Sequence, residues 1–227
     1  MKKTLLFWIF VCSGFVAVSA RAGSIHGVIH AQGKEAATET PGAGAYASRR
    51  FKFVERVNYD DLRDFVVYLK GPMAGAKPPE APAVIRQRDA TFIPHVLPIM
   101  AGTKVEWPNE DDVFHNVFSK SDVNSFDLDL YKKGDPPKVV LFDKPGKVDV
   151  FCSIHAKMSC IVLVLENPCF STSDAAGRYA ISNIPPGTYQ LVAWHERLPD
   201  KLIPVTVKAG EDVKLDITMG IENLPKY

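Results

Sequence analysis

The architecture of the chain can be read most clearly from one stretch, Val148-Asp149-Val150-Phe151-Cys152-Ser153-Ile154-His155-Ala156-Lys157-Met158-Ser159-Cys160-Ile161. Its first four residues predict a β-strand that delivers Cys152 to its end. The six residues after Cys152 predict a loop, and Ile161 begins a returning strand. Such a loop can fold the side chains of Cys152, His155 and Met158 around one point.

Short apolar segments continue outward from this loop and alternate with Gly, Pro, Asn and Asp. Short strands separated by turn residues are typical of a β-sandwich or barrel. No long window has the 3.6-residue period of a helix. The sequence therefore predicts an all-β domain over residues 83–166. Its candidate strands are residues 83–87, 96–100, 104–107, 115–118, 139–142, 148–151 and 161–165.

A second unit is predicted after Asn167-Pro168, which interrupts this pattern. Residues 172–177 and 184–189 are turn segments between further short strands. We therefore expect residues 167–227 to form a small β-sandwich of their own.

Residues 23–82 are expected to provide N-terminal strands and a loop insertion that pack on the barrel. Residues 24–30 and 65–69 have the composition of strands. The first strand of the barrel is predicted to be either 65–69 or 83–87.

The N-terminus predicts a secretory signal peptide over residues 1–22. Lys2 and Lys3 precede an apolar run, and small residues allow cleavage after Ala20 or Ala22. Cleavage after Ala20 would remove two of the 27 basic residues and none of the 26 acidic ones, leaving a net charge of −1. Three of the four cysteines would remain, so at least one is free, metal-bound or paired elsewhere. No apolar stretch of about 20 residues follows, which argues against a membrane span.

The chemistry of the chain is concentrated in four side chains, His115, Cys152, His155 and Met158. A trigonal set of two histidines and one cysteine with a weak axial methionine is the ligand set of a blue-copper electron-transfer site. Soft sulfur holds Cu(I) and imidazole nitrogen satisfies Cu(II), so the site changes little when an electron passes. The pattern predicts one bound copper ion. Zinc could occupy the same ligands, although a thioether is an unusual zinc ligand.

Residues 83–166 resemble cupredoxins of the plastocyanin and amicyanin type. The resemblance rests on segments that occur in the order such proteins show, namely residues 92–94, 102–109, 115–117 and the loop after Cys152. The two-residue spacing between His155 and Met158 is similar to that of amicyanin. The resemblance implies an eight-stranded Greek-key β-barrel with copper at one end.

The same resemblance implies roles for residues around the ligands. Asn116 would hydrogen-bond near Ser153 and tie the two ligand-bearing segments together, which orients the ligands and tunes the metal. His155 would be the partly exposed ligand through which electrons pass.

The second unit resembles the carboxypeptidase regulatory-like, transthyretin-like β-sandwich. Asp174, Gly177 and Tyr179 match an Asp-x-x-Gly-x-Tyr pattern, and residues 185–189 match Pro-Pro-Gly-Thr-Tyr. The two-unit layout is similar to bacterial methylamine-utilisation-like proteins. The expected fold class is therefore all-β, with a cupredoxin barrel followed by a small transthyretin-like sandwich.

The candidate ligands and the two remaining cysteines also have ordinary structural explanations. Cys152 could be a structural thiol, Met158 a core residue and His115 a surface histidine. Cys160 and Cys169 could form a disulfide, but an extended chain separates them by roughly 30 Å. A bridge needs Cα atoms about 5.5 Å apart, so buried thiols are favoured for this pair.

Other polar residues have open interpretations. His95 could neighbour the metal end of the barrel, although a surface position is favoured. Trp194-His195-Glu196 resembles part of a metal or acid-base site, but without a second histidine at suitable spacing a strand end is favoured. The acidic residues before His115, Asp111 among them, are either a solvated loop or a patch that steers a basic partner.

The leading hypothesis is an exported type 1 (blue) copper protein that is not an enzyme and carries single electrons between periplasmic partners through transient contacts. The alternative is a copper-binding, sensing or scaffold module whose C-terminal sandwich binds a partner protein or carbohydrate. The sequence has no His-x-His pair, which a multicopper oxidase requires. A net charge of only +1 argues against nucleic-acid binding. The oligomeric state is left open.

Overall fold

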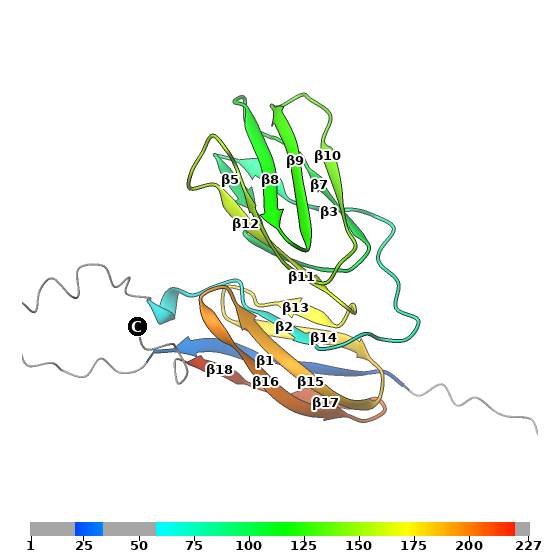
Figure 1. Cartoon of the computed structure of the whole chain (residues 1–227). Helices are drawn as coiled ribbons and strands as arrows, with labels where there is room; N and C mark the ends of the chain where they lie inside the picture. Colours follow the sequence, from blue (N-terminus) through cyan, green and yellow to red (C-terminus); the bar gives the residue numbers. More distant parts are fainter. Residues whose placement is uncertain (1–20, 34–57, 221–227) are drawn as a thin grey trace, which may run out of the picture.

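The structure is a computed structural model that describes residues 21–33 and 58–220. Their regular elements are β-strands, apart from one 3-10 turn, Tyr59–Asp61 (Figure 1). The prediction of an all-β protein is confirmed. The predicted signal peptide lies outside the described residues except for its last two positions. Among the described residues, none forms a helix with the length and hydropathy that crossing a membrane requires.

The first sandwich spans residues 83–165, and its larger sheet has the strand order β6-β12-β11-β8-β9. In β11 and β12, Phe151 lies opposite Ser159 in an antiparallel pair. The predicted strand, loop and returning strand around Cys152 are therefore confirmed, and the loop lies at one end of this sheet. The strands are β6 (Val96–Met100), β8 (His115–Ser121), β9 (Asn124–Tyr131), β11 (Gly146–Phe151) and β12 (Ser159–Leu165).

A second, smaller sheet faces the first one and has the order β10-β7-β3, with a separate two-stranded ribbon of β4 and β5. Alternate residues of these strands point inward, and Trp107, Phe92 and Phe142 are among the largest fully buried side chains. The rings of Phe92 and Trp107 meet edge-on at 5.8 Å. The strands are β3 (Ala83–Val84), β4 (Arg86–Arg88), β5 (Thr91–Ile93), β7 (Thr103–Trp107) and β10 (Lys138–Phe142).

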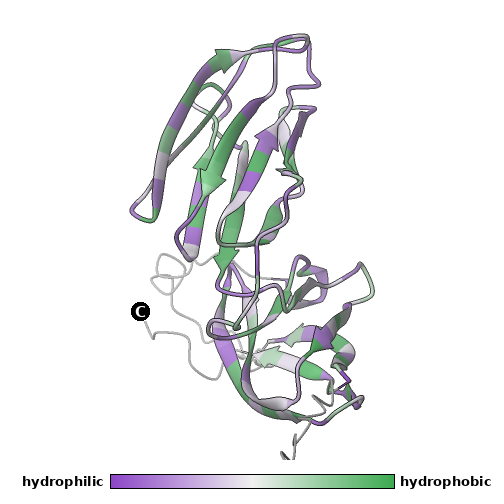
Figure 2. Ribbon diagram, turned by 90° about the vertical axis from the view of Figure 1, so that its right-hand side faces the viewer, coloured by the Kyte–Doolittle hydropathy of each residue, from purple (hydrophilic) through white to green (hydrophobic). Residues whose placement is uncertain are grey.

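The second sandwich also has two sheets. One has the order β13-β2-β15-β16, and the other has the order β14-β1-β17 with β18 also paired to β1. Hydrophobic and hydrophilic residues alternate along many strands of both sandwiches (Figure 2), as expected for strands with one buried face. The strand β12 differs, because residues 160–165 are all apolar and buried. The strands are β1 (Gly23–Gln32), β2 (Val66–Leu69), β13 (Phe170–Thr172), β14 (Arg178–Ile184), β15 (Gly187–His195), β16 (Leu198–Val207), β17 (Asp212–Lys214) and β18 (Ile217–Gly220).

The N-terminal strands belong to the second sandwich, which corrects the expectation that residues 23–82 pack on the barrel. β1 pairs with β14, β17 and β18, and β2 pairs with β13 and β15. The first strand of the barrel is therefore β3, and the first sandwich is inserted between β2 and β13 of the second. The alternation in residues 24–30 predicts a half-buried strand, but it does not indicate which sheet that strand joins.

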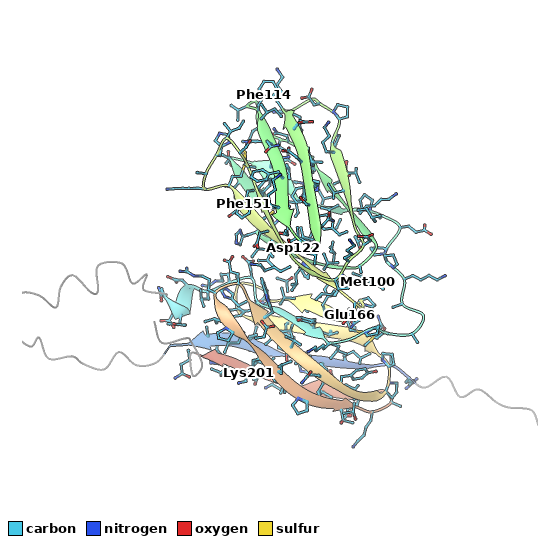
Figure 3. The ribbon with its side chains drawn as sticks, viewed as in Figure 1. Met100, Phe114, Asp122, Phe151, Glu166 and Lys201 are labelled. Carbon is cyan, nitrogen blue, oxygen red and sulfur yellow. The ribbon has the colours of Figure 1, made fainter. Side chains whose placement is uncertain are left out.

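The two sandwiches share a buried apolar junction. Val66 and Trp194 of the second sandwich pack in one cluster with Val96, Ile161 and Leu163 of the first. This cluster covers the outer face of β6 and β12, because these residues point away from the barrel core. Figure 3 shows Glu166 where the sandwiches meet and Phe114 at the far end of the first sandwich.

Both connections between the sandwiches are held together by Asn167, which is 1% exposed. Its Nδ2 donates to the carbonyl oxygens of Leu69 and Gly71, each at 2.6 Å, and its Oδ1 accepts from the Cys169 amide at 2.8 Å. The segments that enter and leave the first sandwich are thereby fixed side by side.

Candidate metal centre

The loop between β11 and β12 is closed by its own backbone. The Cys152 amide donates to the Met158 carbonyl at 3.1 Å, and the Met158 amide donates to the His155 carbonyl at 2.9 Å. Two bonds within seven residues hold the loop in a tight turn. The spacing predicted from the sequence therefore brings Cys152, His155 and Met158 into one compact loop.

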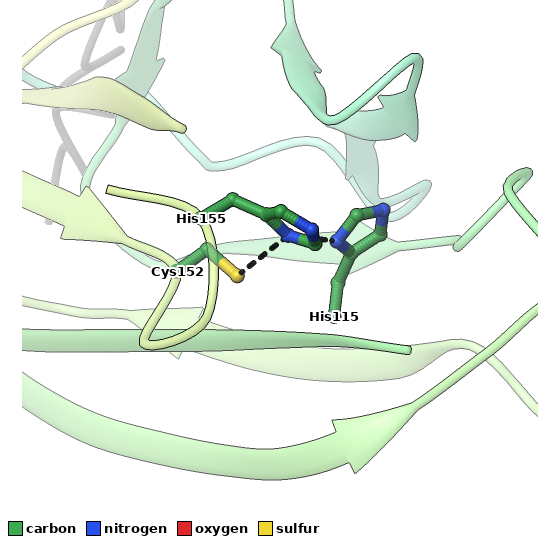
Figure 4. A group of neighbouring side chains, drawn as sticks. All are labelled: His115, Cys152 and His155. Carbon is green, nitrogen blue, oxygen red and sulfur yellow. Dashed lines mark hydrogen bonds between the residues drawn. The ribbon is translucent and has the colours of Figure 1, made fainter. Parts of the chain in front are cut away.

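His115 reaches this loop from the first residue of β8. β8 lies beside β11, with Phe118 opposite Phe151. The donor atoms of His115, Cys152 and His155 all lie within 4.8 Å of one another. The two Nδ1 atoms are 3.0 Å apart, and Cys152 Sγ is 3.7 Å from His155 Nδ1 (Figure 4).

The donor set fits a single metal ion. Ligand bonds of about 2.0–2.3 Å allow opposite donors around one ion to be roughly 4.5 Å apart, so the observed spacing requires little movement. One thiol sulfur and two imidazole nitrogens combine soft and intermediate donors, which suits copper and also admits zinc. Among the described residues, no other group of three or more His, Cys, Asp or Glu side chains is placed to hold a metal.

The candidate ligands differ in their access to solvent. His115 is 0% exposed and Cys152 is 6% exposed, whereas His155 is only half-buried. His155 is therefore the member of the group that a partner molecule can approach, as the cupredoxin resemblance implies.

Met158 is 1% exposed and lies in the same apolar cluster as Cys152 and Cys160. Its backbone is part of the loop, and its side chain points into the barrel core rather than into solvent. The role of Met158 as a weak axial ligand stays a prediction.

Asp111 was not predicted to support the site, and it contacts the buried candidate ligand His115 directly. Its Oδ2 lies 2.8 Å from His115 Nε2, and its oxygens also accept from the amides of Asp89 and Ala90. Burial opposes ionisation of Asp111, but these hydrogen bonds outweigh it and lower the pKa of the carboxyl group. A carboxylate on the second nitrogen of a ligating histidine fixes its tautomer and orientation. The four-residue spacing from Asp111 to His115 is the sequence signal that could have indicated it.

Asn109 holds the segment that carries Asp111. Its Oδ1 accepts from the Asp111 amide at 2.9 Å, and its Nδ2 donates to the carbonyls of Val113 and Tyr131. Tyr131 lies opposite His115 on β9. Asn109 therefore ties the segment before His115 to the neighbouring strand.

Asn116 does not make the bond that the resemblance implied. Its Nδ2 donates to Asp127 Oδ1 at 2.6 Å, and its buried Oδ1 has no partner in the described residues. Asn116 and Ser153 instead line one cavity of about 320 Å³ beside the ligand loop. The two segments are thus close, but no described hydrogen bond joins these two side chains, because the Asn116 amide is turned toward β9.

The three described cysteines, Cys152, Cys160 and Cys169, are buried free thiols, which confirms the preference against a disulfide. Burial raises the pKa of Cys160 well above its ordinary value, and Asp149 adds to this shift. Burial likewise raises the pKa of Cys169. Neither residue belongs to the metal-ligating group, so Cys152 is the thiol placed to act as a ligand.

No protein-family model matches the chain, and no curated protein matches it. Several solved structures that match part of it are copper proteins. A Cu-containing nitrite reductase from Thermus scotoductus SA-01 is 33% identical over 42% of this chain, with a TM-score of 0.36, and the chain covers only 25% of its length.

Two smaller cupredoxins also match. A purple cupredoxin from Nitrosopumilus maritimus is 26% identical over 36% of this chain and 98% of its own, with a TM-score of 0.33. Amicyanin from Paracoccus versutus is 26% identical over 43% of this chain and 96% of its own, with a TM-score of 0.35. Each of these matches covers less than half of the chain.

Proposed function

We propose that the chain is an exported type 1 copper protein that carries single electrons between partners. The observation that carries this proposal is the convergence of one cysteine sulfur and two histidine nitrogens within 4.8 Å at the end of a β-sandwich. When bound, copper would supply one-electron exchange between Cu(II) and Cu(I). His115, Cys152 and His155 would hold it, with Met158 as a weak fourth ligand.

The chain's own residues would keep this site rigid. Asp111 fixes the ring of His115, and the two backbone bonds of the loop fix Cys152 and His155. A preformed donor set moves little when the charge at its centre changes, which favours fast electron exchange.

Exposed apolar side chains close in sequence to the two histidines would serve transient docking. Val113 is 54% exposed, Phe114 is 48% exposed and Ile154 is 50% exposed, and each lies close in sequence to a ligating histidine. A small apolar contact of this kind suits a redox partner that must bind and leave quickly. We propose that the partner is a periplasmic redox protein, in line with the signal peptide expected at residues 1–22.

A carrier is proposed rather than an enzyme. The described residues hold a single metal-ligating group, and the sequence has no His-x-His pair for a multinuclear copper cluster. The carboxylate of Asp111 is already bonded to the His115 ring and to two backbone amides.

The alternative remains a copper-binding, sensing or scaffold module in which a carboxypeptidase regulatory-like sandwich binds a protein or carbohydrate. The strand pairing changes how this alternative must be tested. Residues 167–227 lack β1, which belongs to one sheet of the second sandwich, and β2, which belongs to the other. A tail of residues 167–227 alone would therefore be incomplete, and binding must be tested with the whole chain.

The experiment that separates a carrier from a store is repeated redox cycling of the copper-loaded chain. A carrier is expected to give a reversible one-electron potential and to keep its copper through many cycles with an inorganic oxidant and reductant. Loss of copper on each reduction, or an irreversible response, would favour the alternative. His115→Ala should abolish the reversible response, whereas His26→Ala, at a partly buried position in the second sandwich, should leave it unchanged.

A further inference from the structure

A contact between the two sandwiches lies beside the ligand loop. His95 follows β5 in the first sandwich, and Glu196 lies in the second sandwich, 101 residues further along the chain. His95 Nε2 is 3.3 Å from both carboxylate oxygens of Glu196. The expected surface position of His95 is thus partly covered, because its side chain is 39% exposed and faces this carboxylate.

The other side of the His95 ring contacts the end of the ligand loop. Its Nδ1 donates to the carbonyl oxygen of Ser159 at 3.1 Å, and its own carbonyl accepts from the Ile161 amide at 2.8 Å. His95 therefore bonds to both Ser159 and Ile161, at the start of β12. Ser159 directly follows Met158.

The backbone of Met158 is therefore fixed on both sides. On the loop side, its amide and carbonyl bond to His155 and Cys152. On the strand side, the next residue is bonded to His95, which faces Glu196. A change in the position of Glu196 can therefore reach the Met158 backbone through two hydrogen-bonded steps.

The second sandwich presents Glu196 in a fixed position. Glu196 lies in the two-residue turn between β15 and β16, and Nδ1 of His195, the last residue of β15, accepts from the Arg197 amide at 3.1 Å. The His195 ring packs on Phe65 with centroids 4.9 Å apart. Trp194, one residue earlier, is buried in the junction with the first sandwich.

We propose that Glu196 is a positioning residue for the metal centre, through which the second sandwich tunes a site to which it contributes no ligand. The inference rests on the proposed function. Glu196 orients His95, His95 fixes the Ser159 carbonyl, and the start of β12 sets where the Met158 thioether lies. The second sandwich is then part of the electron-transfer device rather than an attached binding module.

The test compares three variants in the full chain. Glu196→Ala removes the carboxylate, Glu196→Gln keeps an oxygen acceptor of the same shape, and Asp174→Asn breaks the exposed ion pair with Arg178 elsewhere in the second sandwich as a matched control. The first readout is amide hydrogen exchange at Met158 and Ile161 in the metal-free chain. An exposed ion pair of this kind should change the exchange rate up to about fivefold in Glu196→Ala, less in Glu196→Gln and not in Asp174→Asn.

The second readout is the reduction potential and the visible band ratio of the copper-loaded variants. Glu196→Ala should shift both, and Glu196→Gln should restore them in part.

Variants that keep the wild-type exchange rates, potential and spectrum would overturn the inference while leaving the proposed function intact. A wild-type chain that forms no blue centre would instead overturn the proposed function, and the metal-free exchange rates would still test the link from Glu196 to Met158. If Glu196→Ala does not fold, Glu196→Gln alone decides between these outcomes.

Discussion

The Nε2 atom of His115 lies 2.8 Å from a carboxylate oxygen of Asp111, while its Nδ1 atom faces His155 Nδ1 at 3.0 Å. One ring nitrogen is thus anchored and the other is directed at the candidate metal position. His115 is fully buried, so its orientation depends on this carboxylate rather than on water. The pair explains how a ligand brought from a separate strand is aligned with the loop of Cys152.

Removal of the Asp111 carboxylate should weaken metal binding. Asp111→Ala is expected to lower copper affinity about 10–100-fold, the usual effect of losing a partner that orients a ligating histidine. Competition with a chelator of known affinity measures this change. Asp112→Ala is the matched control, because the Asp112 side chain is 90% exposed. Equal losses in the two variants would mean that general negative charge, and not the bond to His115, supports the site.

Replacement of Met158 should separate packing from ligation. Met158→Leu conserves volume and should cost less than about 1.5 kcal/mol of unfolding free energy. Its reduction potential should nevertheless rise, because loss of a donor destabilises Cu(II) more than Cu(I). Met219→Leu, at an equally buried position in the second sandwich, should leave the potential unchanged. An unchanged potential in Met158→Leu would make Met158 a core residue only.

The second sandwich should lose stability in mild acid through His195. Burial lowers the pKa of His195 below its ordinary value of 6.5, so the folded chain favours the neutral ring. The unfolded chain then binds the proton more readily, and the contribution of His195 to stability is complete above pH 6.5 and falls as the pH decreases below it. The slope can reach about 1.4 kcal/mol per pH unit. Denaturant titrations between pH 7.5 and 5.5 should show a smaller loss in His195→Gln, and identical slopes would contradict this.

The junction between the sandwiches should be a major source of stability. Trp194 is 7% exposed and packs against Val96 and Ile161. Trp194→Ala should cost about 3–5 kcal/mol of unfolding free energy. Leu202→Ala, at a residue that is 50% exposed, should change it by no more than about 0.5 kcal/mol. Urea unfolding measures both, and a single unchanged transition in Trp194→Ala would show that the sandwiches are stable without their contact.

The ligand loop could be predicted from the sequence because its information is local. Cys152, His155 and Met158 lie within seven residues between two strands, so their spacing limits where their side chains can go. His115 lies outside this loop, and it was predicted because a blue-copper site needs a second histidine. In the structure it lies on β8, which is adjacent to β11.

Long-range pairing could not be predicted in the same way. The alternation of β1 indicates a buried face, but it does not reveal that the partners are β14, β17 and β18, more than 140 residues away. Glu196 and His95 meet only because the first sandwich is inserted into the second. The contact of Asp111 with His115 could not be predicted for another reason, since an acidic residue in a loop is ordinarily solvated.

Whether Cys152 ligates copper is decided by the visible absorption spectrum of the full chain with one equivalent of copper. We expect an intense thiolate-to-copper band that disappears on reduction, is absent from Cys152→Ala and persists in Cys160→Ala, whose thiol is buried two residues beyond Met158. A chain that binds one copper without colour, or a Cys152→Ala variant that keeps the band, would contradict it.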